Sequence, residues 1–302
     1  MELRHLRYFV AVAEEGSLSV AAQKRLHTAQ PSLSRQIHDL EMELGVQLFV
    51  RRPRGIELTP SGRVFLDNAR VALLQVEAAA EAARRAAQPE KSAFSIGFHT
   101  GYEMDWLPAV MGVLRGKLPS TEITIRSEDS PDLAAALMRG KVDVAFMRPD
   151  KNAPGLQFKL LRHDPIVVLM PRDHPLAARR AVRLRDLEGQ IYIGVSPSRA
   201  PTLRAAIEDF FKRNGLTMKA AHQAENVSMA ISLIASTGGI SLLPLYAQNL
   251  LPNTIVTRPL QGAPPMVDLM IGYNEANTSS LLKFLLSKVE EIKFQAMRRD
   301  GA

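Results

Sequence analysis

The change of periodicity at Pro89 constrains this chain more than any other feature. Before the proline, apolar residues recur every three or four positions, which is the spacing of amphipathic helices. After it, short apolar runs alternate with helical segments, which is the pattern of layered α/β domains. A chain of 302 residues exceeds the roughly 100–200 residues of one domain, so we expect a helical head, a joining helix and a larger α/β region.

Three short helices are expected before Gly45. The first has apolar side chains at helical spacing from Leu3 to Ala13 and stops at Gly16, and Ser17 is a good N-cap for the second. The third helix carries an apolar stripe from Leu33 to Leu44. Short helices joined this tightly are typical of a helix-turn-helix.

The polar face of the third helix and the segment after it predict a nucleic-acid contact. Gln30, Ser34 and Arg35 lie near the start of the helix, where a recognition helix meets base edges and phosphates. Residues 46–60 are expected to form a two-stranded wing that turns at Pro53–Gly55, with arginines at its tip that suit phosphate or minor-groove contacts. The alternatives are a solvated helix face and an ordinary surface charge run.

Charge alone does not identify the DNA-binding part. The formal charge is +7, of which residues 1–90 carry +1 and residues 91–302 carry +6. The argument for DNA therefore rests on local basic clusters and helix geometry. Because the chain has no cysteine, no signal peptide and no long apolar span, we exclude disulfides and expect a cytoplasmic protein with no membrane partner.

Several segments of the head carry a family resemblance: Ala21–Ala22, Gln30–Ile37, Leu40–Glu41, Leu44–Gly45, Leu48–Phe49, Arg51–Arg52 and Leu58–Gly62. They resemble the winged helix-turn-helix of LysR-type transcriptional regulators. The resemblance implies binding to double-stranded promoter DNA, a homodimer that pairs into a homotetramer, and RNA polymerase as a further partner. The side chains expected at the DNA are Ser17, Thr28, Gln30, Pro31, Ser32, Ser34, Arg35, Arg51, Arg52 and Arg54.

One departure from the family pattern lies between Ala22 and Gln30. The chain carries one residue more than usual there, within Gln23–Arg25. If the helix simply continued, one insertion would turn everything after it by about 100°. We therefore expect the second helix to end differently or to absorb a bulge.

A helix is expected from Thr59 to about Gln88. Its apolar positions alternate in steps of three and four, which favours a coiled-coil seam between two chains. The alternative is an amphipathic helix that packs on its own domain. The predicted seam residues are Leu66, Ala69, Leu73, Val76 and Ala80.

The region after Pro89 is predicted to be α/β with largely parallel sheets. We expect strands at 94–98, 122–126, 142–147, 166–170, 191–195, 240–243 and 267–272, and helices near 106–116, 131–139, 201–213, 227–236 and 279–296. The segments that resemble the LysR effector-binding region are Gly97, Leu107–Pro108, Gly140–Asp143, Arg172–Leu176 and Gly239–Pro244. The resemblance implies a two-subdomain fold like a type II periplasmic binding protein. Residues 1–15 and Arg258–Leu260 are most similar to the branch that senses aromatic acids.

The expected domains are a winged helix-turn-helix at 1–60, a dimerisation helix at 61–90 and an effector-binding domain at 91–302. Within the last, subdomain I takes about 91–163 and 267–302, and subdomain II about 164–266. The chain is expected to cross between them near Leu161–Pro165 and Gly262–Met266.

A ligand is expected in the crevice between the subdomains, where strand ends and helix starts favour a carboxylate. Arg148 is the candidate for direct pairing, because a guanidinium holds a carboxylate through two hydrogen bonds. The alternatives are a salt bridge of Arg148 to a neighbour, a packed His99 and a Ser130 that serves only as an N-cap. The expected lining residues are His99, Thr100, Gly101, Ser130, Phe146, Arg148, Ser196, Pro197, Thr202 and Asn226.

Two other function classes compete with a regulator. A cytoplasmic α/β enzyme is disfavoured because nucleophile-elbow, zincin, P-loop and dinucleotide-binding motifs are absent from the sequence. The seven histidines are scattered, so no metal site and no cofactor is expected. A small-molecule-binding protein without a regulatory role is disfavoured by the predicted DNA-reading head.

Overall fold

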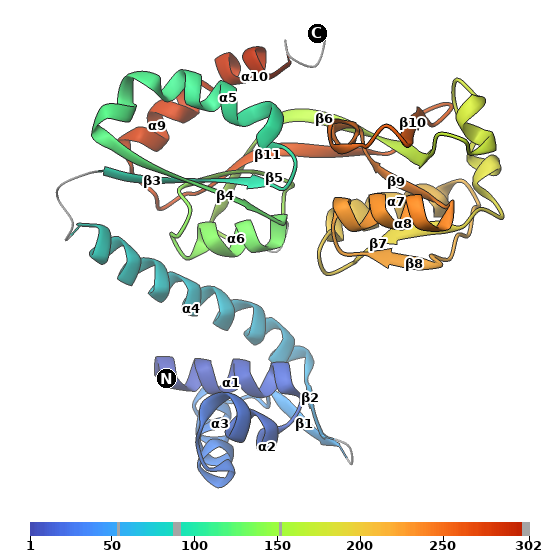
Figure 1. Cartoon of the computed structure of the whole chain (residues 1–302). Coiled ribbons are helices and arrows are strands. Elements are labelled where there is room, and N and C mark those ends of the chain that lie inside the picture. The colour runs from blue at the N-terminus through green and yellow to red at the C-terminus, as the bar shows by residue number, and fades with distance from the viewer. Residues whose placement is uncertain (53–54, 87–91, 151–152, 298–302) are drawn as a thin grey trace. The chain divides into compact units, whose positions relative to one another are not determined.

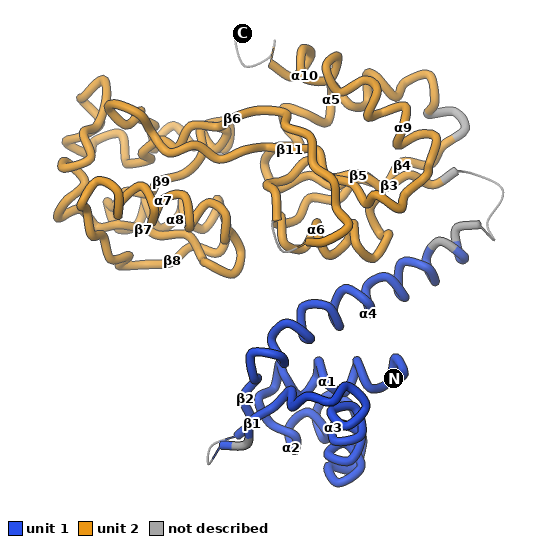
Figure 2. Tube along the Cα trace, turned by 180° about the vertical axis from the view of Figure 1, so that it is seen from behind, with its two compact units in different colours: residues 1–84 blue, residues 85–302 orange. Residues whose placement is uncertain are grey.

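Helices build residues 1–44 and 60–86, and strands alternate with helices in most of the remaining chain (Figure 1). The computed structural model describes residues 1–52, 55–86, 92–150 and 153–297. It divides into two units, Met1–Arg84 and Arg85–Ala302 (Figure 2). Arg54 at the expected wing tip and the expected helix end at Pro89 lie outside the described residues.

The first unit has the predicted helix-turn-helix and wing. Gly16 and Gly45 end their helices in the left-handed region, at φ 61° and 68°, where glycine has no Cβ to clash. The Ser17 hydroxyl accepts a hydrogen bond from the Val20 backbone N–H at 3.4 Å, as expected of an N-cap. The elements are α1 (Leu3–Glu15), α2 (Leu18–Val20), the π-helix η1 (Ala21–Leu26), α3 (Gln30–Leu44), β1 (Phe49–Arg52), β2 (Gly55–Leu58) and α4 (Pro60–Ala86).

The π-helix η1 accommodates the additional residue between Ala22 and Gln30. A π-turn closes its hydrogen bonds over five residues instead of four, so it takes up a surplus residue without turning the chain that follows. His27 ends the segment in the left-handed region at φ 49°. The expected bulge is therefore present, and α3 still buries Leu33 and Leu40 completely.

The first turns of α4 belong to the core of the first unit. Leu66 and Ala69 are 9% and 2% exposed and pack with Phe9 and Leu48 of the head. The prediction that they form a seam between two chains is wrong, because this face of α4 closes the head's own core. Leu73 is partly buried against the same core, whereas Val76 and Ala80 are exposed.

The second unit contains two lobes that share long strands. In the first lobe the strand order is β4-β3-β5-β11-β6, and in the second it is β6-β9-β7-β8, with β10 beside β6. The strands are β3 (Ser92–His99), β4 (Thr121–Glu128), β5 (Val144–Met147), β6 (Leu156–Pro171), β7 (Tyr192–Val195), β8 (His222–Ala224), β9 (Ile240–Pro244), β10 (Ile255–Pro259) and β11 (Met266–Asn274).

The pairing is mixed, which corrects the expectation of largely parallel sheets. β3 pairs in parallel with β4 and β5, and β7 with β8 and β9. β6 and β11 pair antiparallel with each other. β6 passes from one lobe to the other without leaving the strand, since Pro165 pairs with β11 and Ile166 pairs with β9.

Helices cover both faces of the strands of the first lobe. Figure 1 shows α5, α9 and α10 on one side of β3–β5 and α6 on the other. Among the described residues, no helix has the length and apolar character that crossing a bilayer requires. The helices of this unit are α5 (Glu103–Leu114), α6 (Ser130–Met138), α7 (Pro201–Arg213), α8 (Val227–Thr237), α9 (Ser280–Ser287) and α10 (Val289–Met297).

Candidate functional site

A hollow of about 730 Å³ lies between the start of α3 and the β1–β2 hairpin. Gln30, Pro31, Ser34 and Arg35 line it, as do His38 and residues of the hairpin. These side chains offer amide, hydroxyl and guanidinium groups, which are the groups that pair with base edges and phosphates. The predicted recognition face is therefore assembled beside a wing.

The hairpin is fixed to α3 by Glu41, which the sequence analysis named only as part of the family resemblance. Its Oε1 accepts hydrogen bonds from the backbone N–H groups of Leu48 and Phe49, at 2.7 and 3.0 Å. A carboxylate that accepts two backbone bonds sets the position of the strand relative to the helix. The signal in the sequence was an acidic residue late in α3, facing the strand that follows.

The other residues predicted to contact DNA do not line this hollow or lie outside the described part of the chain. Ser17 is used as a helix cap, Thr28 is half-buried, and Ser32 is exposed outside the hollow. The exposed Arg52 donates from Nε to Glu57 across the hairpin at 3.2 Å. The side chain of Arg51 and the whole of Arg54 lie outside the described part of the chain.

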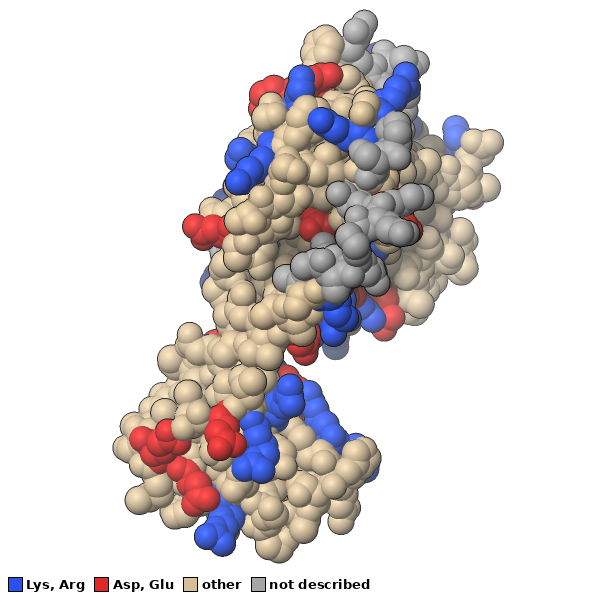
Figure 3. Space-filling view, turned by 90° about the vertical axis from the view of Figure 1, so that its left-hand side faces the viewer, with Lys and Arg blue, Asp and Glu red and all other residues tan. Residues whose placement is uncertain are grey.

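Glu14 joins the π-helix to α4. Its carboxylate pairs with Arg25 of η1, and it accepts hydrogen bonds from Nη2 and Nε of Arg70 in α4 at 2.7 and 3.1 Å. Burial raises the pKa of Glu14, but the hydrogen bonds and charges of the two arginines outweigh burial and lower that pKa overall. On the face seen in Figure 3, the first unit shows acidic and basic side chains together, in keeping with the small net charge of residues 1–90.

A second candidate site lies between the two lobes of the second unit. Two small hollows of about 20 and 40 Å³ share His99, Arg148, Arg199 and Ala200 in their walls. An outer hollow of about 470 Å³ shares Arg199 with both and shares further residues with the larger of them. We call the two small hollows the inner crevice and the outer hollow its mouth.

Arg148 is the buried cation of the inner crevice. It follows β5, is 3% exposed and has no carboxylate at ion-pair distance among the described residues. Its Nε has no hydrogen-bond partner there, and its guanidinium lies 5.9 Å from the centre of the Tyr246 ring. The alternative of a salt bridge to a neighbour is therefore not what the structure shows. Tyr246 shares a side-chain hydrogen bond with Arg148, but it brings no charge. A buried charge without an opposite charge beside it is costly, so this position favours an anion.

Ser130 holds the backbone of Arg148. Its hydroxyl accepts a hydrogen bond from the Arg148 N–H at 3.0 Å, while Asp129 occupies the N-cap position of α6. Ser130 is 8% exposed. It is thus a positioning residue for Arg148, and the alternative of a simple N-cap is wrong.

His99 presents a neutral imidazole to the same crevice. It is 6% exposed, its Nδ1 has no partner among the described residues, and its ring lies 5.8 Å from Tyr102 and 6.3 Å from Tyr246. Burial, and secondly the charge of Arg148, lower the pKa of His99 well below its ordinary value of 6.5. A neutral imidazole offers one donor and one acceptor, so His99 adds hydrogen bonding without a second charge.

The remaining crevice predictions divide into two groups. Thr100, Gly101, Thr202 and Asn226 line the crevice or its mouth, and Thr202 Oγ1 donates to the Pro149 carbonyl at 3.3 Å across the lobes. At Gly101, φ is 99° and a Cβ would come within 2.7 Å of the Tyr246 ring, so only glycine fits.

Phe146, Ser196 and Pro197 do not line the crevice. Phe146 is fully buried in the first lobe and stacks on Phe98 with ring centres 4.9 Å apart. Side chains alternate along a strand, so Phe146 of β5 points into the core. Ser196 bonds instead to the Ser198 hydroxyl at 3.0 Å in the turn before α7.

Sequence reasoning missed Tyr246, and it covered Arg199 only as part of the range 196–202 expected to line the crevice. Tyr246 lies after β9 and stacks on Tyr102 of the first lobe with ring centres 4.0 Å apart. Arg199 pairs with Asp132 of α6 at 3.1 Å. Both contacts join the two lobes at the crevice, and neither has a local signal in the sequence.

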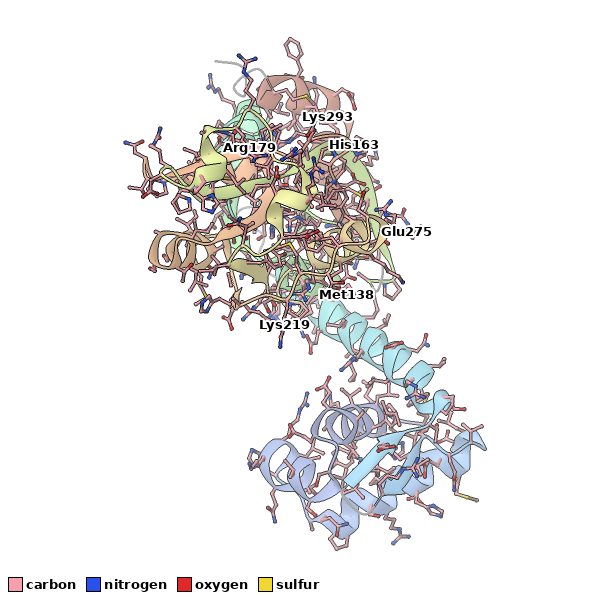
Figure 4. All side chains as sticks on the ribbon, turned by 90° about the vertical axis from the view of Figure 1, so that its right-hand side faces the viewer. Met138, His163, Arg179, Lys219, Glu275 and Lys293 are labelled. Carbon is pink, nitrogen blue, oxygen red and sulfur yellow. The ribbon has the colours of Figure 1, made fainter. Side chains whose placement is uncertain are left out.

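The surplus positive charge of residues 91–302 is not focused on the crevice. Figure 4 shows Arg179 and Lys293 in the upper part of the second unit and Lys219 at its lower end. Arg179 and Lys293 are each paired with a carboxylate, Asp186 and Glu290. The buried cation of the inner crevice is Arg148.

Comparisons with known proteins agree with both sites. Residues 3–63 match the family of bacterial regulatory helix-turn-helix proteins, lysR family, and residues 87–289 match the LysR substrate binding domain. The chain belongs to the LysR family of transcriptional regulators. In sequence order it therefore has a DNA-binding head followed by a type II periplasmic-binding-protein-like domain. The family consists of transcriptional regulators, so the alternative of an enzyme is rejected.

Individual relatives in this family match over nearly the whole chain. The Hca operon transcriptional activator HcaR of Escherichia coli is 34% identical, covering 96% of this chain and 98% of HcaR. The crystal structure of full-length BenM, a regulator of Acinetobacter baylyi, superposes with a TM-score of 0.59 at 30% identity and covers 97% of this chain and 96% of BenM. The regulator CbnR, solved with its target DNA, is similar at a TM-score of 0.56 and 25% identity, over 98% of this chain and all of CbnR.

Proposed function

We propose that this LysR-type regulator is controlled by a small anionic effector, an aromatic acid or another carboxylate, bound between the two lobes of its second unit. The observation that carries the proposal is the buried guanidinium of Arg148, which has no carboxylate at ion-pair distance among the described residues and lies beside a neutral His99. A carboxylate there would gain charge-assisted hydrogen bonds and relieve the cost of the buried charge. The resemblance to the branch that senses aromatic acids supports the same class of ligand.

Contacts between the lobes are the structural features through which an effector would change the arrangement of the lobes. Tyr246 stacks on Tyr102, and Thr202 bonds to the Pro149 carbonyl, so each contact joins one lobe to the other. A ligand that binds one arrangement of the lobes better than another shifts the population toward that arrangement. We propose that this shift alters the DNA binding of the heads or their activation of transcription.

The DNA contacts follow from the hollow on the first unit. Gln30, Ser34 and Arg35 would meet base edges, and Pro31 would pack beside them. The wing arginines Arg51, Arg52 and Arg54 would meet the phosphate backbone, together with Ser17, Thr28 and Ser32 around the helix-turn-helix. Changes at Gln30 or Ser34 are therefore expected to relax sequence preference, and changes at Arg52 to weaken binding to all sequences alike.

The domain division and the assembly are part of the same proposal. We keep a DNA-binding domain at 1–60, a dimerisation helix at 61–90 and an effector domain at 91–302. A homodimer would use Val76 and Ala80, which α4 leaves exposed, together with the half-buried Leu73. Pairs of dimers would form a homotetramer on two half-sites, with RNA polymerase as the further partner.

Fluorescence anisotropy on double-stranded DNA tests the regulatory role. A two-half-site fragment selected from a random library should bind with an affinity that falls steeply with salt, and benzoate or a related carboxylate should shift the binding curve. In Arg148→Met the DNA binding should remain while the carboxylate effect disappears. Arg180→Met, on an exposed arginine outside the crevice, is the matched control and should behave as wild type. A carboxylate effect that survives in Arg148→Met would contradict the proposal.

A further inference from the structure

Carboxylates become more numerous from the interior of the crevice to its mouth. Five carboxylates line the mouth, with Arg199 as the cation among them. The residues are Glu103, Glu128, Asp129, Asp132 and Glu225. The interior presents Arg148 beside the neutral His99, and its walls also include Arg199, Asp129, Asp150 and Glu225. A ligand that reaches from Arg148 into the mouth therefore passes from a buried cation to a rim where carboxylates outnumber cations.

The carboxylates of the mouth are only partly neutralised. Arg199 lies 3.1 Å from Asp132 and 3.8 Å from Asp129, so one guanidinium serves two carboxylates. Glu128 has its own partner, since Arg126 Nη1 lies 3.4 Å from its Oε1. Glu103 accepts from the Gly101 N–H at 2.7 Å, which satisfies hydrogen bonding but leaves the charge. Burial is the main cause that raises the pKa of Asp129, in spite of the opposing charge of Arg199.

Glu225 adds a carboxylate without any ion pair in the described part of the chain. It precedes α8 and is exposed, and it lines both the larger inner hollow and the mouth. It faces the mouth together with Asp129 and Asn226. The negative charge therefore extends from the rim to the wall shared with the interior.

Polar groups lack partners in the interior of the crevice, and negative charge lacks balance at its mouth. At the inner end, Arg148 and His99 are both more than nine-tenths buried. Arg148 Nε and His99 Nδ1 have no hydrogen-bond partner among the described residues. At the outer end, carboxylates exceed cations. The larger inner hollow and the mouth share Thr100, Asp129 and Asn226 in their walls, so the two hollows adjoin each other.

We infer that the effector carries a carboxylate at one end and an amino group at the other. The carboxylate pairs with Arg148, and the ammonium lies among the carboxylates of the mouth. A second carboxylate in that position would meet like charges, which is costly at short range. The inference rests on the proposed function, and it narrows the effector class from carboxylates in general to amino-bearing monocarboxylates.

Two matched ligand series test the inference on the full-length chain by titration calorimetry. One series is benzoate, para-aminomethylbenzoate and terephthalate, and the other is valerate, delta-aminovalerate and glutarate. Within each series only the charge of the far end changes. In the series that fits the crevice, the amino ligand should bind at least about tenfold more tightly than the dicarboxylate, with the neutral ligand between them.

Glu225→Gln tests whether the carboxylates of the mouth determine the order of affinities among the amino, neutral and dicarboxylate ligands. Glu225 has no ion pair in the described residues, so its replacement should leave folding intact. The variant should narrow the preference for the amino ligand by about two- to threefold, because a single exposed charge is partly screened. Glu188→Gln, on an exposed glutamate outside the crevice, should leave the preference unchanged.

The outcomes separate this inference from the proposed function. If a dicarboxylate binds as tightly as its neutral counterpart, and Arg148→Met abolishes that binding, the inference is wrong and the proposed effector site stands. If the amino ligand leads but Glu225→Gln and Glu188→Gln behave alike, the mouth does not set the preference and the inference is wrong. If no member of either series binds in a way that depends on Arg148, the proposed site fails and the inference with it.

Discussion

Two arginines of the second unit, Arg148 and Arg162, show how differently a shielded guanidinium can be used. Arg162 Nε lies 2.6 Å from Asp164 Oδ1, and its guanidinium stacks near the rings of Tyr102 and Trp106. Arg148 has a neighbouring ring but no carboxylate at ion-pair distance in the described residues. The contrast lies in the ion pair, because the fold supplies a carboxylate to Arg162 and none to Arg148.

The difference separates an arginine that stabilises the fold from an arginine that is available to bind a ligand. A shielded ion pair with added hydrogen bonds is costly to break, because removal of one partner leaves the other charge unpaired. A shielded charge with no partner lowers stability until a ligand arrives, and such a cost is typical of functional sites. Arg162 is therefore expected to support the fold and Arg148 to support binding.

The largest effect is expected from breaking the completed pair. Asp164 is 2% exposed and also accepts from the Tyr102 hydroxyl. Asp164→Asn should lower the free energy of unfolding by about 3–5 kcal/mol, measured by urea denaturation. Asp268→Asn is the control, since Asp268 pairs with the exposed His163 at 2.7 Å and its loss should cost less than about 1 kcal/mol. Equal losses of unfolding free energy in the two variants would show that the buried Asp164 contributes no more to stability than the exposed pair of Asp268.

The next effect has the opposite sign. Arg148→Met removes a buried charge that has no carboxylate partner in the described residues, so the ligand-free protein should become more stable by about 1–3 kcal/mol. Arg162→Met should be destabilising in the same urea assay. If both variants lose stability to a similar extent, Arg148 is a structural residue like Arg162 and the comparison fails.

A pH dependence is expected from His99. Because its pKa in the folded state lies well below 6.5, the folded protein holds His99 neutral, whereas the unfolded chain takes up a proton near pH 6.5. His99 therefore favours the folded state above pH 6.5, and this contribution is lost as the pH falls below that value. Urea denaturation at pH 7.5 and pH 5.5 should show a smaller drop in stability for His99→Gln than for wild type. Identical drops would mean that His99 is protonated inside the crevice.

The smallest effect concerns the exposed pairs of the first unit. Glu14→Gln weakens the contacts with Arg25 and Arg70, which are exposed enough that the loss should be about 0–1 kcal/mol. The pKa of Glu14 is lowered overall, so its contribution is present above pH 4.5 and fades as the pH falls further. A loss above that range in thermal unfolding would make Glu14 a structural pair like Asp164.

Local signals in the sequence predicted the head well. The stops at Gly16 and Gly45 and the cap at Ser17 depend on backbone geometry that one residue type decides. The surplus residue before Gln30 predicted a bulge, and η1 is that bulge. The seam residues Leu66 and Ala69 were misplaced because a heptad pattern does not tell which surface the apolar face meets.

The second unit was harder to predict because its pairing is tertiary. The first half of β6, from Leu156 to Pro165, carries charged residues and a proline, so no apolar run marked it as a strand. The edge strand β8 is short and partly polar, and β10 pairs only through β6. Phe146 was assigned to the wrong face because β5 is buried on both sides, which removes the alternation that reveals a face.

The crevice was predicted at its strand ends and missed at its contacts between lobes. His99, Ser130 and Arg148 follow or precede regular elements, and that position is visible in the sequence. The stacking of Tyr246 on Tyr102 joins residues far apart in the chain. No periodicity or motif announces such a meeting, so the structure was needed to find it.

The most direct test is to titrate the carboxylate series into wild type and Arg148→Met side by side. At least one carboxylate should bind wild type and release heat, and Arg148→Met should bind it at least about tenfold more weakly, because a charge-assisted hydrogen bond is lost. Equal affinity in the two proteins, or no binding by any carboxylate, would contradict an effector held by Arg148.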